Sequence, residues 1–204
     1  MPVPVPTAVA AYLATLYLVT GVTHADGLAD CGDAVVVHGD TERRREVLKD
    51  TTTGVGAVAA VALVVAGLAL AAVAVAGLAV GEAVAVVVAS EVGAKAAMAT
   101  LAAVADPPHD GLGSALADGS GVRGVAFALV LALPVVALGW WARGDVSGLL
   151  AAVTPVVTGV LVAAAAVSWA RSRLGGVSGD VFGATNELAR LVGLHVGVIA
   201  WTLS

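Results

Sequence analysis

Cysteine, aromatic side chains and charged side chains are all scarce in this sequence of 204 residues. Phe, Trp and Tyr make up 4% of it, Asp, Glu, Lys and Arg make up 12%, and Cys31 is the single cysteine. One cysteine excludes an internal disulfide and a cysteine-rich metal site. The formal net charge of −5 offers no basic face that would match nucleic-acid phosphates, so no nucleic-acid partner is expected.

Apolar residues are abundant instead. They make up 59% of the sequence, and the mean hydropathy is +0.99. Soluble domains carry about 45–50% apolar and about 25% charged residues. The composition therefore predicts an all-α fold, a polytopic integral membrane helical bundle.

Six apolar segments predict about six transmembrane helices, because a helix needs about 20 residues to cross the hydrocarbon layer. Many Gly and Ala residues in them favour close helix packing in lipid. The segments are 7–23, 55–80, 83–105, 124–141, 146–170 and 188–203.

The long polar loops 24–54, 106–123 and 171–187 alternate with short connections. If every segment crosses the membrane, the three long loops lie on one side. Positive loops stay inside, so we expect this side to be cytoplasmic and the protein to be a multi-pass protein of the cell (inner) membrane. The basic residues on it are Arg43, Arg44, Arg45, Lys49, Arg123, Arg171 and Arg173, against Arg143 alone on the other side.

The segment 23–50 gathers seven of the fifteen carboxylates, and THADGLADCGD is its most informative part. Asp26, Asp30 and Asp33 are spaced by four and three residues, so a helix would place them on one face with His24 just upstream. Like charges repel one another, and Mg²⁺ with oxygen ligands would neutralise them. The alternative is a solvated acidic loop.

SGDVFGATNELAR, at the start of the last apolar segment, is a second polar cluster. Asp180 and Glu187 are seven residues apart, so a helix would place them on one face, near Thr185 and Asn186. Gly183 would let a backbone or a phosphate approach closely. Together with the first cluster this predicts a site with room for a metal and a pyrophosphate. The alternative is helix capping and solubilisation.

Two further clusters are candidates for substrate binding. Glu91 and Lys95 form an i,i+4 pair inside an apolar segment, where ionisable residues are functional candidates, although a mutually neutralised structural pair is the alternative. In REVLKDTTTGVGA, the predicted substrate contacts are Lys49, Asp50, Gly54 and Gly56.

The remaining polar residues support other interpretations. The arginines Arg43, Arg44 and Arg45 are interpreted as an anchor to anionic lipid. His195 is interpreted as a side chain packed against a neighbouring helix, and His109 is a second lone histidine. No Ser–His–Asp arrangement, Walker loop or dinucleotide fingerprint is present.

Four motifs resemble those of the adenosylcobinamide-GDP ribazoletransferase, or cobalamin (5′-phosphate) synthase, family. GVTHADGLADCGDA is similar to the family's GGxHxDGxADxxDG, REVLKDTTTGVGA to its MKDSxxGxxG, and GDVFGATNELARL to its GDxxGAxNE. EVGAKAAMATLAAVADPPHDGLGSAL is similar to its charged membrane helix followed by a GLG loop. The resemblance runs from about Gly21 to the C-terminus. Departures include Ala34 for Gly, Thr52 and Thr53 in the turn, and Lys95 for Arg.

The resemblance implies a Mg²⁺-dependent membrane transferase that joins adenosylcobinamide-GDP to α-ribazole or its 5′-phosphate and releases GMP. Asp26, Asp30, Asp33 and Asp180 would hold Mg²⁺ and the pyrophosphate, and Glu187 would complete the metal site or orient the ribazole hydroxyl. A carboxylate or His24 would act as general base, and Lys49 or Lys95 would offset the charge on GMP.

The resemblance also implies one membrane-embedded catalytic domain over 1–204. We expect that an N-terminal family segment is missing from it. The sequence leaves open whether the protein forms a homo-oligomer. Two rival functions are weighed against the transferase. The motif of CDP-alcohol phosphatidyltransferases is DGxxAR. Here Asp26-Gly27 is followed by Leu28, Ala29 and Asp30, and the arginine of that motif is absent. A cation or proton path would be lined by Glu91, Lys95 and His195.

Overall fold

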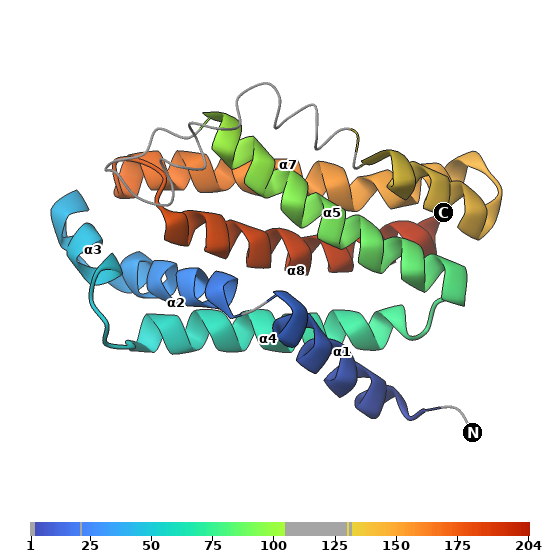
Figure 1. The fold of residues 1–204 in the computed structure, drawn as a ribbon, viewed down its shortest axis with the longest axis horizontal. Coiled ribbons are helices and arrows are strands. Elements are labelled where there is room, and N and C mark those ends of the chain that lie inside the picture. The colour runs from blue at the N-terminus through green and yellow to red at the C-terminus, as the bar shows by residue number, and fades with distance from the viewer. Residues whose placement is uncertain (1–2, 21, 105–129, 131) are drawn as a thin grey trace.

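The computed structural model describes residues 3–20, 22–104, 130 and 132–204, and this part of the chain is helical with no β-strand (Figure 1). The predicted all-α bundle is therefore confirmed. In chain order the helices are α1 (Val5–Thr20), α2 (Thr23–Val36), α3 (Thr41–Leu48), α4 (Val55–Val75), α5 (Val80–Val104), a helical stretch at 132–143, α7 (Val146–Arg173) and α8 (Gly179–Leu203).

Three helices, α4, α5 and α7, are long and apolar enough to cross a membrane. α4 contains only Ala, Val, Leu and Gly, so nothing but its backbone is polar, and a helix satisfies that backbone internally in lipid. α1 and α2 are bent by 95° relative to each other and add a fourth span only if the pair counts as one broken span.

The described residues thus provide three or four candidate spans, and the predicted count of about six is not confirmed. α1 has 16 residues, too few to cross alone. α8 is long enough to cross, but its first half carries the charged residues Asp180, Glu187 and Arg190. Of the predicted segment 124–141, residues 124–129 and 131 lie outside the described part of the chain, and 132–141 belong to the helical stretch that ends at 143. The cytoplasmic placement of the long loops stays a prediction.

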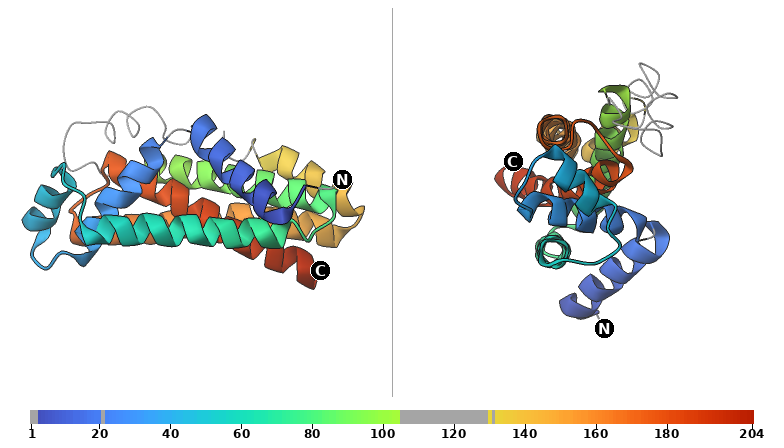
Figure 2. Two further views of the ribbon diagram at one scale, coloured as in Figure 1. Left: turned by 90° about the horizontal axis from the view of Figure 1, so that it is seen from below. Right: turned by 90° about the vertical axis from the view of Figure 1, so that its left-hand side faces the viewer.

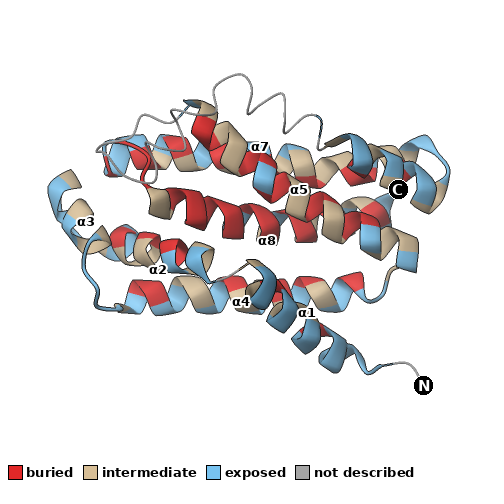
Figure 3. Ribbon diagram, in the orientation of Figure 1, coloured by how far each residue is buried: buried red, intermediate tan, exposed pale blue. Residues whose placement is uncertain are grey.

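α8 lies at the centre of the bundle and packs against α2, α4, α5 and α7. Buried positions follow one another along it in Figure 3. α5 and α7 approach closely where small residues meet. A Cβ atom at Gly93 would lie 2.5 Å from the carbonyl oxygen of Pro155, so this crossing admits no side chain there.

One end of the bundle collects the C-terminal end of α2, α3, the start of α4, the end of α7 and the start of α8 (Figure 1, left). Two arginines of α3 hold it there. Arg44 is buried and donates to the carbonyl oxygens of Ala34 and Val35 at the end of α2. Arg45 Nε donates to the Leu174 carbonyl oxygen just beyond α7, at 2.6 Å. Both therefore bind helix ends, whereas the sequence suggested a lipid anchor.

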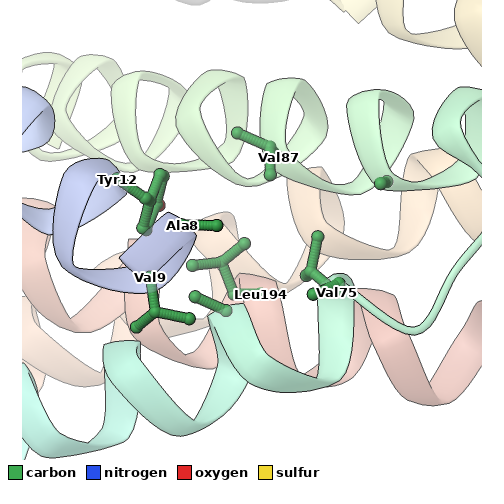
Figure 4. Close-up of a pocket in the computed structure, with 9 residues that line it drawn as sticks. Ala8, Val9, Tyr12, Val75, Val87 and Leu194 are labelled. Carbon is green, nitrogen blue, oxygen red and sulfur yellow. The ribbon is translucent and has the colours of Figure 1, made fainter. Parts of the chain in front are cut away.

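α1 packs loosely, since only Val9 and Leu16 among its residues are buried. An apolar cavity of about 180 Å³ separates it from α4, α5 and α8, with Tyr12, Val87 and Leu194 among its walls (Figure 4). Tyr12 is the one polar side chain that lines this cavity. The cavity therefore offers little chemistry.

A larger apolar groove of about 590 Å³ runs between α4 and α7, with α2 and α8 as its floor. Viewed end-on in Figure 2 (right), α4 and α7 stand apart with α2 and α8 beside them. Thr185 is the only lining residue with a hydroxyl group. Both walls of the groove belong to helices that are long and apolar enough to cross a membrane.

Candidate functional site

The acidic motif forms a helix, as its spacing predicted. Asp26, Asp30 and Asp33 all lie on α2, where Asp26 is exposed and the other two are half-buried. Asp33 differs from its neighbours because both of its carboxylate oxygens are bonded. Oδ2 accepts from the Gly54 N–H at 2.7 Å, and Oδ1 accepts from the Ala57 N–H at 2.9 Å. Asp33 therefore caps the start of α4.

Gly54 and Gly56 pack against α2. A Cβ atom at Gly54 would lie 2.8 Å from Cγ of Asp33, and one at Gly56 would lie 2.7 Å from Cγ2 of Val36. The Gly54–Gly56 turn thus makes room for the acidic helix. Its predicted contacts with a phosphate stay a prediction.

The acidic helix meets the start of α8 at two glycines. A Cβ atom at Gly27 would lie 2.7 Å from the Asp180 carbonyl oxygen, and one at Gly183 would lie 3.0 Å from the His24 carbonyl oxygen. Asp180, Gly183 and Glu187 follow one another at i, i+3 and i+7, so one stripe of α8 faces the first turns of α2. The structure therefore brings together the two motifs that the sequence predicted to meet.

Lys49 joins this site from the end of α3. With Arg45 it lines a small cavity of about 50 Å³, whose opposite wall holds Ser178 and Asp180. Ser178 Oγ donates to Asp180 Oδ2 at 3.2 Å. The cavity places two basic side chains beside the N-terminus of α8, which is itself a favourable place for an anion.

Asp50 lies next to Lys49 in the sequence but is fully exposed. Its Oδ1 accepts a hydrogen bond from the Thr52 N–H at 3.0 Å. This backbone donor lowers the pKa of Asp50 below its usual value, so its carboxylate stays ionised in mild acid. The structure gives Asp50 a turn-forming role, and its predicted substrate contact stays a prediction.

A second polar layer lies between α5 and α8. Glu91 pairs with Arg190, whose Nε lies 2.5 Å from Oε1 and whose Nη2 lies 3.1 Å from Oε2. Lys95 Nζ donates to Asn186 Oδ1 at 2.7 Å. The Glu91–Lys95 pair weighed as a structural alternative does not form, because each side chain finds its partner on α8 instead.

Glu187 belongs to the same layer and is almost completely buried. Its Oε1 accepts from Arg190 Nη1 at 2.6 Å and from Asn186 Nδ2 at 3.1 Å. Its Oε2 has no hydrogen-bond partner, and neither do Thr185 Oγ1 and His24 Nδ1. Such unsatisfied buried groups are unusual and mark a place where a ligand or water would bind.

Arg190 is the site residue that the sequence did not single out. The signal was present, because an arginine three residues after Glu187 on a helix lies beside it. Tyr17 on α1, which interacts electrostatically with Glu187 and Arg190, gave no such signal. His195 is packed as predicted, with Nε2 3.1 Å from the Gly67 carbonyl oxygen on α4. His109 and the GLG loop lie outside the described residues.

The carboxylates do not form an all-protein metal cage. Within the described ranges, no group of three or more His, Cys, Asp or Glu side chains is placed to hold a metal ion. Asp30 is nevertheless close enough to Asp26, Asp33 and Asp180 to be repelled by each. Mg²⁺ takes one or two carboxylates and completes its shell with water and substrate phosphates. The carboxylates around Asp30 fit a Mg²⁺ ion that is shared with substrate phosphates.

Comparison with known proteins identifies the family to which the chain belongs. Residues 1–198 match the model of a protein family described as cobalamin-5-phosphate synthase. A protein of Halorubrum lacusprofundi named adenosylcobinamide-GDP ribazoletransferase is 50% identical over 99% of this chain and 79% of its own length. A protein of the same name from Halobacterium salinarum is 49% identical over 98% of both chains.

A third relative with that name, from Haloquadratum walsbyi, is 45% identical over 98% of this chain and 78% of its own length. No solved structure matches. The family match favours the transferase over the two rival functions. The chain therefore belongs to the cobalamin-5-phosphate synthase family, whose members are transferases of late cobalamin biosynthesis.

Proposed function

We propose that this protein joins adenosylcobinamide-GDP to α-ribazole or its 5′-phosphate and releases GMP, in a Mg²⁺-dependent reaction at the cytoplasmic side of the cell membrane. The acceptor hydroxyl oxygen forms a bond to the phosphorus next to cobinamide. The bond from this phosphorus to the bridging oxygen breaks, and GMP leaves with that oxygen.

The observation that carries the proposal is the contact between α2 and the start of α8. It brings Asp30 close to both Asp180 and Asp26. Lys49 and Arg45 line a cavity together with the same Asp180. A pyrophosphate needs both neutralisation and an anchor for its leaving half. Carboxylates for a cation and two basic side chains at one helix terminus supply both.

Asp30, Asp26 and Asp180 are the residues that would hold Mg²⁺. When bound there, the ion would neutralise the pyrophosphate and orient it for in-line displacement. Lys49, which is exposed at the mouth of the small cavity, would stabilise the negative charge that develops on GMP. Asp33 would contribute by fixing α4 against the acidic helix.

Two side chains are suited to the acceptor hydroxyl. His24 Nδ1 is buried without a partner and would accept the hydroxyl proton. Glu187 would orient the hydroxyl through its unpaired Oε2. Glu187 is two helical turns, about 10 Å along the axis, from Asp180. Arg190 holds it on the far side from Asp180, which favours this role over a shared metal ion.

The test is GMP release by membranes that contain the full chain, supplied with adenosylcobinamide-GDP and α-ribazole 5′-phosphate, with and without Mg²⁺. We expect Mg²⁺-dependent release that falls by at least about 100-fold in Asp30→Asn. Asp145→Asn is the matched control. Asp145 caps α7 at the opposite end of the bundle by accepting from the Gly148 N–H, and asparagine also caps helices.

Release without Mg²⁺, or near-normal turnover in Asp30→Asn, would contradict the metal assignment. No release by correctly inserted wild-type protein would contradict the activity itself. Running the reaction with free α-ribazole in parallel identifies the preferred acceptor.

A further inference from the structure

α5 and α8 are joined by two polar rungs that share one register. Glu91 lies opposite Arg190, and Lys95 lies opposite Asn186, so a step of four residues forward on α5 matches a step of four back on α8. This is the register of two antiparallel helices, and α5 and α8 run in opposite directions in Figure 1. The rungs therefore belong to one interface.

The Arg190 guanidinium is the junction of this interface. Its side chain is completely buried, and three of its nitrogens bond to two carboxylates on different helices. Removing one partner from a buried ion pair leaves an uncompensated charge in a medium of low dielectric constant. A lysine would keep the charge but not the planar fork that reaches both carboxylates.

Glu187 links the interface to the acidic site. It lies one turn after Gly183, on the stripe of α8 that contacts α2, and it interacts electrostatically with His24. Arg190 and Asn186 fix Oε1, while Oε2 is buried and unpaired. A carboxylate held by one oxygen has a defined direction for the other.

We propose that Arg190 is a positioning residue of the transferase: it fixes Glu187 for the ribazole hydroxyl, and Glu91 anchors Arg190 from α5. This rests on the proposed function. Glu91 thereby acts as a support for the site, not as a substrate ligand. Arg190 acts on the acceptor side of the reaction only, since its partners include none of the residues near Asp180 and Lys49.

The test uses the double variant Glu91→Gln/Arg190→Gln, which removes the Glu91–Arg190 ion pair together with the bond from Arg190 to Glu187. Arg190→Gln alone and Arg190→Lys accompany it. Each full-length variant is assayed for thermal unfolding in detergent and for steady-state kinetics with both substrates varied in turn.

We expect the double variant to be more stable than Arg190→Gln alone, because one of the two carboxylates left without the arginine is neutralised as well. It should still unfold below the wild-type temperature, because Glu187 stays buried without its ionic partner. Its kcat/KM for the ribazole substrate should still fall about 100-fold, the loss typical of a misplaced reactant. Its KM for adenosylcobinamide-GDP should stay within about threefold of wild type. Recovery of kcat/KM together with stability would overturn the proposal, because Arg190 would then be a structural ion only.

Arg190→Lys decides the matter if the double variant fails to fold. It keeps the charge, so the variant should keep most of its stability but have a lower kcat/KM for the ribazole substrate. Equal losses of kcat/KM for the two substrates would overturn the proposal. Arg143→Gln is the control. Arg143 Nε lies 3.9 Å from Glu82 Oε1, and the guanidinium stacks on Trp201 at the other end of the bundle. Its loss should therefore lower stability and leave kcat/KM unchanged. If the proposed function is wrong, the wild type and Arg143→Gln will both release no GMP, which distinguishes this outcome from failure of the positioning role.

Discussion

At the scale of single residues, Asp33 completes the N-terminus of a helix to which it does not belong. α4 begins after Gly54, which has no side chain to cap it, and the first N–H groups of a helix have no partner within it. Asp33 reaches across from α2 and accepts from Gly54 and Ala57. One residue of the acidic motif thus acts as a structural cap, although its spacing matches that of its two neighbours.

Asp33→Ala should therefore lower the free energy of unfolding by about 1–2 kcal/mol, as the loss of a helix cap does. Asp33→Asn should lower it less, because one amide oxygen can still accept a hydrogen bond. Chemical unfolding of the purified protein in detergent measures both. Asp26→Ala is the matched control on the same helix, since Asp26 is exposed, and an equal loss of stability there would contradict the capping role.

Sequence patterns singled out most of the polar residues that meet at the site, but they did not predict which side chains pair with one another. The spacing of Asp26, Asp30 and Asp33 was sufficient to predict their common helix. The partner of Glu91 was not predictable in the same way. Lys95 is its neighbour at i+4, whereas Arg190 is 99 residues away. Pairing across helices depends on their register, and register follows from the packing of whole surfaces.

At the scale of helices, glycines set the distance between α2 and α8. Gly27→Ala places a methyl group 2.7 Å from the backbone oxygen of Asp180, which cannot move aside. We expect α2 to be displaced and GMP release to fall by about 100-fold, the effect of a misplacement of about 1 Å.

Gly67→Ala is the comparison for this variant. A Cβ atom there would also lie within 2.7 Å of a neighbour, but that neighbour is the flexible side chain of Leu191. GMP release should stay near wild type, because a rotamer change relieves the clash. The two alanine variants are assayed side by side, and equal activity would show that the α2–α8 distance is unimportant.

Long apolar runs predicted the helices α4 and α5 and the greater part of α7 well, because such runs have one stable conformation in lipid. The last apolar segment was predicted only from 188, whereas α8 begins at Gly179. Its first turns carry polar residues, so hydropathy did not include them. They are buried by α2 and α5, which composition alone does not reveal.

At the scale of the whole molecule, the basic residues at the α3 end predict that this end faces the cytoplasm. In a Cys31→Ala background, Asp50→Cys should react with a membrane-impermeant maleimide only from the cytoplasmic side. Val146→Cys, at the opposite end and 63% exposed in the parent protein, should react only from outside. Labelling of intact cells and of inverted vesicles distinguishes the two, and the reverse pattern would contradict the orientation.

The central position of α8 also has a consequence for biosynthesis. The ribosome makes α8 last, so α5 enters the membrane with Glu91 and Lys95 long before Arg190 and Asn186 exist, 99 and 91 residues later. Until then these charges have no partner on α8. The nascent chain must keep them in contact with water, with lipid headgroups or with the insertion machinery. Assembly of the bundle is therefore completed only at the end of translation, when its last helix arrives.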